Sequence, residues 1–113
     1  MQLINSPISI TELKQLAQNK FGSFIKAVVD ISKSIMVIDA ELHADEEQLL
    51  LENSSKQEDL WGINIYPEEN KENWIEFDSM INLRPAQGNL TRSVINLEIQ
   101  AKIRDIVNKL IQQ

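Results

Sequence analysis

The side chains best suited to chemistry form an alternating acidic run, Asp39, Glu41, His43 and Asp45, which contains the only histidine of the chain. On an extended strand, every second side chain points to the same face. Carboxylates and an imidazole gathered on one face would suit Mn²⁺, Mg²⁺ or a Zn²⁺ ion that keeps an open water position. Asp45 is better placed to cap a helix, however, and side chains along one strand lie too far apart to share an ion. We therefore predict no metal and no cofactor, and the candidate ligands for a metal are Glu41, His43 and Asp45.

The segment from residue 84 to residue 92, RPAQGNLTR, concentrates groups that recognise anions. Arginine binds carboxylate and phosphate through two parallel hydrogen bonds, and a glycine-containing turn can aim backbone N–H groups at an anion. With one glycine and no Gly-Lys-Ser/Thr, the segment matches no phosphate-loop motif. Its candidate ligand-binding residues are Arg84, Gln87, Asn89 and Arg92. The alternative is a structured turn whose arginines pair with the acidic residues of segment 41–78.

A second group of candidate ligand-binding residues lies on the preceding strand. Asn64 and Tyr66 share a strand face with Gly62, which leaves room for a ligand or for another backbone. Trp61 belongs to the opposite face, where it is expected to pack in the core. If Trp61 were exposed beside Trp74, the pair could anchor a partner, because interfaces favour tryptophan.

The residues available for catalysis are few. The chain has no cysteine, which excludes thiol nucleophiles, thiolate metal sites and disulfides. A Ser-His-acid set would have to use His43, and no serine lies in a nucleophile-elbow motif. The remaining catalytic candidates are His43, Glu41 and Asp59, acting as a small metal- or acid/base-dependent hydrolase in which Arg84 stabilises charge. We expect a binding protein rather than an enzyme.

The length and charge of the chain limit the domain organisation and the kinds of partner it can have. A chain of 113 residues with 42% hydrophobic and 25% charged side chains is expected to form one globular domain over residues 1–113. The net charge of −6 is uneven, because residues 41–78 hold 12 of the 17 acids and only two bases. This acidity argues against duplex nucleic acid as a partner. The acidic segment is interpreted as a solvated face, and the alternative is a regulator that binds a basic partner.

The N-terminal residues indicate the compartment. They contain no basic n-region and no sustained apolar stretch of the kind found in secretory signals. The longest apolar runs, such as 35–38 and 49–51, are far too short to span a bilayer. We expect a cytoplasmic protein with no membrane partner.

Hydrophobic periodicity and capping signals predict helices over about 10–21, 46–51 and 97–112, with Ser9, Asp45 and Asn96 as their N-caps. Strands are predicted over 26–32, 34–42, 60–66 and 74–83. This order indicates an α+β fold: a mainly antiparallel four-stranded sheet with two longer helices and one short helix, packed mostly on one face. Two free sheet edges are compatible with a homodimer.

Several segments resemble one protein family along nearly the whole chain. They are 26–31 (KAVVDI), 41–45 (ELHAD), 55–62 (SKQEDLWG), 65–67 (IYP) and 84–89 (RPAQGN). The family consists of small bacterial proteins known only as a domain of unknown function. The resemblance implies a self-contained bacterial domain and carries no activity, cofactor or site residue.

From these residues we predict a small binding module whose site lies between the Trp61–Tyr66 strand and the Arg84–Arg92 loop. Its partner would be a small anionic ligand or a protein segment. The two alternatives are the hydrolase around Glu41, His43 and Asp59, and the acidic regulator of a basic partner.

Overall fold

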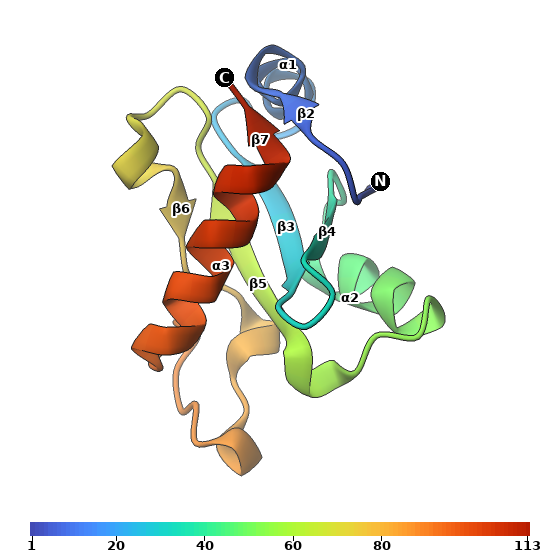
Figure 1. Ribbon diagram of the computed structural model, residues 1–113, viewed down its shortest axis with the longest axis vertical. Helices are drawn as coiled ribbons and strands as arrows, with labels where there is room; N and C mark the ends of the chain where they lie inside the picture. Colours follow the sequence, from blue (N-terminus) through green and yellow to red (C-terminus); the bar gives the residue numbers. More distant parts are fainter.

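The computed structural model describes residues 1–113 and is built around one antiparallel sheet (Figure 1). The sheet has the strand order β1-β4-β3-β5-β6. Its strands are β1 (Gln2–Ile4), β4 (Ile35–Ile38), β3 (Ile25–Asp30), β5 (Leu60–Ile65) and β6 (Ile75–Glu76). The α+β class is therefore confirmed, but the sheet has five strands rather than four. The additional strand is β1, which pairs along the free edge of β4.

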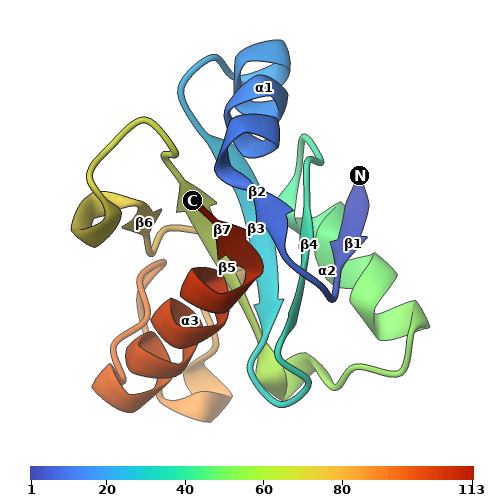
Figure 2. The same ribbon diagram turned by 45° about the horizontal axis from the view of Figure 1, so that its top comes forward.

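Three α-helices accompany the sheet: α1 (Ile10–Lys20), α2 (His43–Glu52) and α3 (Leu97–Leu110). Short 3-10 turns lie at Gln57–Asp59, Lys71–Asn73, Met80–Asn82 and Pro85–Gln87. Figure 2 shows the start of α1 beside the end of α3, where β2 (Ile8–Ser9) and β7 (Ile111–Gln112) form a parallel pair. No helix has both the length and the apolar character needed to cross a bilayer.

The predicted caps of the two longer helices are confirmed. The Ser9 hydroxyl accepts a hydrogen bond from the Glu12 N–H at 3.1 Å, as a capping residue should. The Asn96 side chain accepts from the N–H groups of Glu98 and Ile99. Helix α3 ends at Leu110, before the predicted residue 112, because the next two residues pair with β2.

Helices cover both faces of the sheet, each over its own apolar cluster. Helices α1 and α3 pack on the face that carries the larger core, and α2 packs on the other face through Leu50 against Val28, Val37 and Leu60. The two longer helices therefore share one face, as the prediction of helices packed mostly on one face requires, and only α2 takes the other. Side-chain alternation explains this, because β3 and β5 carry only apolar side chains on one face, whereas on the other face Val28 and Leu60 provide a smaller apolar area among polar residues.

Two local predictions are wrong. The strand predicted over 74–83 is reduced to β6, because the chain then turns away and the Ser79 N–H bonds to the Arg92 carbonyl. Helix α2 begins at His43, so Asp45 lies in its first turn and is not its cap. Leu42 takes the cap position and supplies no side-chain hydrogen bond. Asp39, at a φ of +69°, ends the preceding strand early and allows this earlier start.

Candidate functional site

Arg84, the leading candidate for anion recognition, is occupied by contacts within the protein. Its side chain is 9% exposed and its guanidinium lies 4.6 Å from the ring of Trp61. It donates hydrogen bonds to three main-chain carbonyls, those of Gln57, Leu60 and Ile81. It also lies 3.8 Å from the Glu47 carboxylate. With its donors engaged in this way, Arg84 positions the polypeptide and is not available to a ligand.

Asn82 completes the edge of β5 where β6 no longer reaches. Its Oδ1 accepts from the Gly62 N–H at 2.8 Å, and its Nδ2 donates to the Gly62 carbonyl at 2.9 Å. The side chain thus replaces a neighbouring strand. A Cβ on Gly62 would lie 2.6 Å from the Cβ and Oγ of Ser79. The space beside Gly62 is therefore filled by Ser79 and not reserved for a ligand.

Asn89 organises the loop that the sequence singled out. It is 4% exposed, and its Nδ2 donates to three carbonyls, those of Asn82, Thr91 and Ser93. Its Oδ1 accepts from the Ile95 N–H at 2.9 Å. Gln87 is exposed but donates to the Glu58 carbonyl at 3.2 Å. The segment 84–89 is thus a structured turn, as the alternative interpretation proposed, although most of its bonds go to main-chain groups.

Neither tryptophan is at the surface. Trp61 and Trp74 are each 2% exposed, and both belong to the larger core cluster. The idea of an exposed tryptophan pair that anchors a partner is therefore wrong. The side-chain alternation along this strand predicts correctly that Trp61 lies on the core face.

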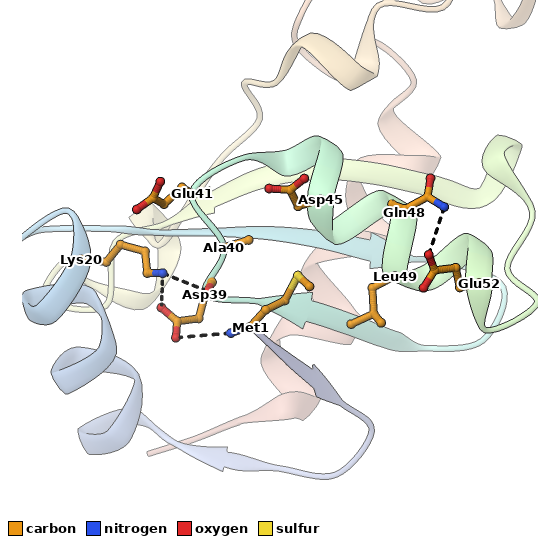
Figure 3. Close-up of a pocket in the computed structure, with 9 residues that line it drawn as sticks. All are labelled: Met1, Lys20, Asp39, Ala40, Glu41, Asp45, Gln48, Leu49 and Glu52. Atoms are coloured by element: carbon orange, nitrogen blue, oxygen red, sulfur yellow. Dashed lines mark hydrogen bonds and ion pairs between the residues drawn. The ribbon is translucent and has the colours of Figure 1, made fainter.

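The structure separates the residues proposed for metal binding and hydrolysis. Glu41 and Asp45 line an open acidic cavity of about 500 Å³ beside the start of α2 (Figure 3). His43 instead faces Ile63 on β5, and Asp59 is the last residue of the 3-10 turn that directly precedes this strand. Positions 59 and 63 are four residue steps apart, about 13 Å along an extended strand. No group of three or more side chains of the metal-binding types lies close enough to hold an ion.

A second, smaller cavity brings cationic side chains together with His43. It has a volume of about 200 Å³ and lies between the start of α2, the turn that follows β6, and the sheet. We call it the His43 pocket. Its lining residues are Lys26, Leu42, His43, Ala44, Ser79, Met80, Ile81 and Arg92.

The charges around the His43 pocket are mainly positive. Lys26 makes no ion pair, and its ammonium lies 5.3 Å from the centre of the Phe21 ring. Arg92 pairs with Asp78 at 2.7 Å through its Nε, and its side chain is 56% exposed. The N-terminus of α2 has no side-chain cap and adds the positive end of a helix dipole.

His43 is held in one tautomer. Its Nε2 lies 2.8 Å from the Ile63 carbonyl oxygen, which can only accept, so Nε2 carries the hydrogen. Burial lowers the pKa of the imidazole, and the nearby positive charges of Lys26 and Arg92 also lower it. The hydrogen bond to Ile63 and the charge of Asp78 act in the opposite direction. The ring is therefore neutral at neutral pH, with Nδ1 as an acceptor.

Of the predicted site residues, His43 and Arg92 line this pocket and the others do not. Asn64 is paired with Lys26 across β3 and β5, but its Nδ2 donates to Glu76 and to the Asp78 carbonyl. The Tyr66 hydroxyl also contacts Glu76, at 3.3 Å. These two side chains support the strand pairing beside the pocket.

Lys26 is the pocket residue that sequence reasoning missed. A signal for it was present, because it is the only charged side chain in the apolar run 24–29, FIKAVV. A lysine placed within an otherwise buried strand needs a reason, since burying a charge is unfavourable.

The fold and the pocket define a small α+β domain with a five-stranded antiparallel sheet, helices on both faces and a cationic pocket at the start of α2. A family model described as "Protein of unknown function (DUF5674)" matches residues 2–110, so the chain belongs to this family. No curated protein and no solved structure shows significant similarity to the chain.

Proposed function

We propose that the protein is a binding module that holds a small anionic ligand in the His43 pocket. The observation that carries this proposal is the convergence of Lys26 and Arg92, far apart in sequence, on one cavity at the uncapped start of α2. Lys26 has no carboxylate partner, and its ammonium contacts only the Phe21 ring, so its charge can pair with a ligand. Carboxylate or phosphate oxygens are the groups that such donors recognise.

The size and rim of the pocket limit the ligand. A volume of about 200 Å³ corresponds to roughly six or seven water molecules at their share of liquid volume. It accommodates one oxyanion group and a few further atoms, but not a whole nucleotide. Leu42 and Met80, which are 56% and 62% exposed, form an apolar rim. The rim suits a ligand with a short apolar portion next to its anionic group.

The test is a calorimetric titration with inorganic phosphate and acetate, together with thermal denaturation. We expect saturable binding in the native protein and in the control variant Lys56→Ala, because Lys56 is exposed and forms no ion pair. Lys26→Ala and Arg92→Ala should bind at least about tenfold more weakly, since a charge-assisted hydrogen bond contributes roughly 1.5–3 kcal/mol.

The matched control is needed because phosphate also stabilises proteins without binding to a site. Equal shifts in melting temperature for the native protein and all three variants, with no saturable heat, would show that phosphate acts only through this general effect. The proposed site would then be wrong.

A further inference from the structure

We propose that the His43 pocket selects an anion that carries a hydrogen-bond donor beside its charge, and that His43 Nδ1 is the acceptor that makes the selection. The shared chemistry is an O–H group next to an anionic oxygen, as in hydrogen phosphate or a 2-hydroxycarboxylate. This inference rests on the proposed function and names the ligand class of the same site.

The first step is the orientation of the imidazole. The Ile63 carbonyl accepts from Nε2 at 2.8 Å, which leaves the Nδ1 lone pair without a proton. Nδ1 has no hydrogen-bond partner in the protein, and it is not among the buried side-chain atoms left unpaired. The atom is therefore not fully buried, and it belongs to a ring that lines the pocket.

The second step is the lack of other strong acceptors among the lining side chains. Lys26 and Arg92 only donate. The Ser79 side chain is 1% exposed and its oxygen already accepts from the Ile81 N–H at 3.2 Å, so it offers little to a ligand. Asp78, which faces His43 from the turn after β6, has one carboxylate oxygen bound to Arg92. His43 therefore supplies the acceptor and the surrounding groups supply the donors.

The third step is the effect on ligand choice. An anion with an O–H group can direct it at Nδ1 while its charged oxygens meet Lys26 and Arg92. An isosteric anion without a proton places an oxygen lone pair against the Nδ1 lone pair. Sites built to bond a ligand O–H discriminate strongly against analogues that lack it, because the polar group of the site is then left unpaired.

The test compares two matched pairs of ligands at constant ionic strength and about pH 7.5. The pairs are inorganic phosphate against sulfate, and lactate against propionate. We expect the native protein to bind the O–H-bearing member of at least one pair at least about tenfold more tightly. The pair that shows this preference identifies the ligand as a protonated oxyanion or as a hydroxy acid.

Two variants of His43 test whether Nδ1 is responsible. His43→Phe removes the acceptor and should abolish the preference. His43→Gln can donate to the Ile63 carbonyl and still offer an amide oxygen, so it should keep part of the preference. If His43 had a purely structural role, its substitution would change the affinities for both ligands of a pair equally.

The pH dependence gives a further readout. The groups that face His43 are Lys26 on β3, Asp78 and Arg92. When the pH is lowered far enough to protonate Nδ1, the acceptor becomes a donor, and sulfate should gain affinity relative to phosphate.

The outcomes separate the two proposals. If both ligands of each pair bind saturably with equal affinity, the proposed selection by His43 is wrong, whereas the proposed anion site is supported. No saturable binding of any of the four ligands overturns the proposed function itself. If His43→Phe does not fold, the comparison of ligand pairs in the native protein and in His43→Gln still decides the question.

Discussion

The substitution Glu46→Gln provides a quantitative test of the packing between α2 and the sheet. Glu46 is 0% exposed on the inner face of α2, and its Oε2 accepts from the Ala40 N–H at 3.1 Å. Its Oε1 has no partner. Burial raises the pKa of the Glu46 carboxyl to about 9, and the hydrogen bond from Ala40 and the charge of Lys26 only partly oppose this rise. The folded protein therefore holds Glu46 protonated at neutral pH.

The magnitude follows from proton linkage. In the unfolded chain the carboxyl has its ordinary pKa of 4.5, so folding at neutral pH must take up a proton. This uptake costs about 3 kcal/mol at pH 7, because each pH unit above the ordinary pKa contributes about 1.4 kcal/mol. A carboxyl whose pKa is raised in the folded state contributes fully to the free energy of unfolding below about pH 4.5. This contribution is lost as the pH rises toward 9. Glutamine has the shape of the protonated acid and can still accept from Ala40, but it needs no proton.

We therefore expect Glu46→Gln to raise the free energy of unfolding by about 3 kcal/mol at pH 7 and to leave it nearly unchanged at about pH 4. Urea denaturation at several pH values in this range measures the difference directly. Glu52→Gln is the control, because Glu52 lies on the same helix and is exposed. A gain that is the same at every pH, or a loss at pH 7, would refute the assignment of a buried, protonated carboxyl.

Three further substitutions test the network around β5. Asn82→Ala should lower the free energy of unfolding by about 3 kcal/mol in urea, because three hydrogen bonds to main-chain groups are lost, whereas Asn70→Ala on an exposed loop should change it by less than about 0.5 kcal/mol. Gly62→Ala should lower the melting temperature, with a loss of about 1–3 kcal/mol, because the new Cβ meets Ser79 at 2.6 Å; an unchanged melting temperature would contradict this contact. Arg84→Lys should lose about 2 kcal/mol in the same urea experiment, since one ammonium cannot reach three carbonyls; retention of full stability would mean that these bonds contribute nothing.

The parts of the fold that sequence reasoning predicted well are those with local causes. Ser9 and Asn96 cap helices through bonds to residues two or three positions away, so their role can be read from the segment itself. The buried strands β3 and β5 follow from runs of apolar residues. Strand β1 was missed, because three residues carry little pattern and their pairing partner is β4, more than thirty residues away. The predicted strand over 74–83 failed because a bond between Ser79 and Arg92 redirects the chain.

The candidate site was harder to predict for the same physical reason. Arg84 has the chemistry of an anion-binding residue, but its acceptors lie as far away as Gln57, and only the folded chain brings them together. His43 was grouped with Glu41 because strand alternation would align them. The chain leaves the strand at Asp39 and enters α2 at His43, which turns the imidazole toward β5. The pocket itself depends on Lys26 and Arg92, which no local motif connects.

Asn82 and Arg84 occupy main-chain groups at the edge of β5. This arrangement also affects whether the folded protein associates with other copies of itself. An uncovered main-chain edge recruits strands from other molecules and promotes aggregation. These two side chains bind the Leu60 carbonyl and both main-chain groups of Gly62. They end the sheet at this point, because a side chain cannot extend the hydrogen-bond ladder to a further strand. Their loss would do more than destabilise the fold, since it would expose an apolar strand edge while most of the native structure remained in place.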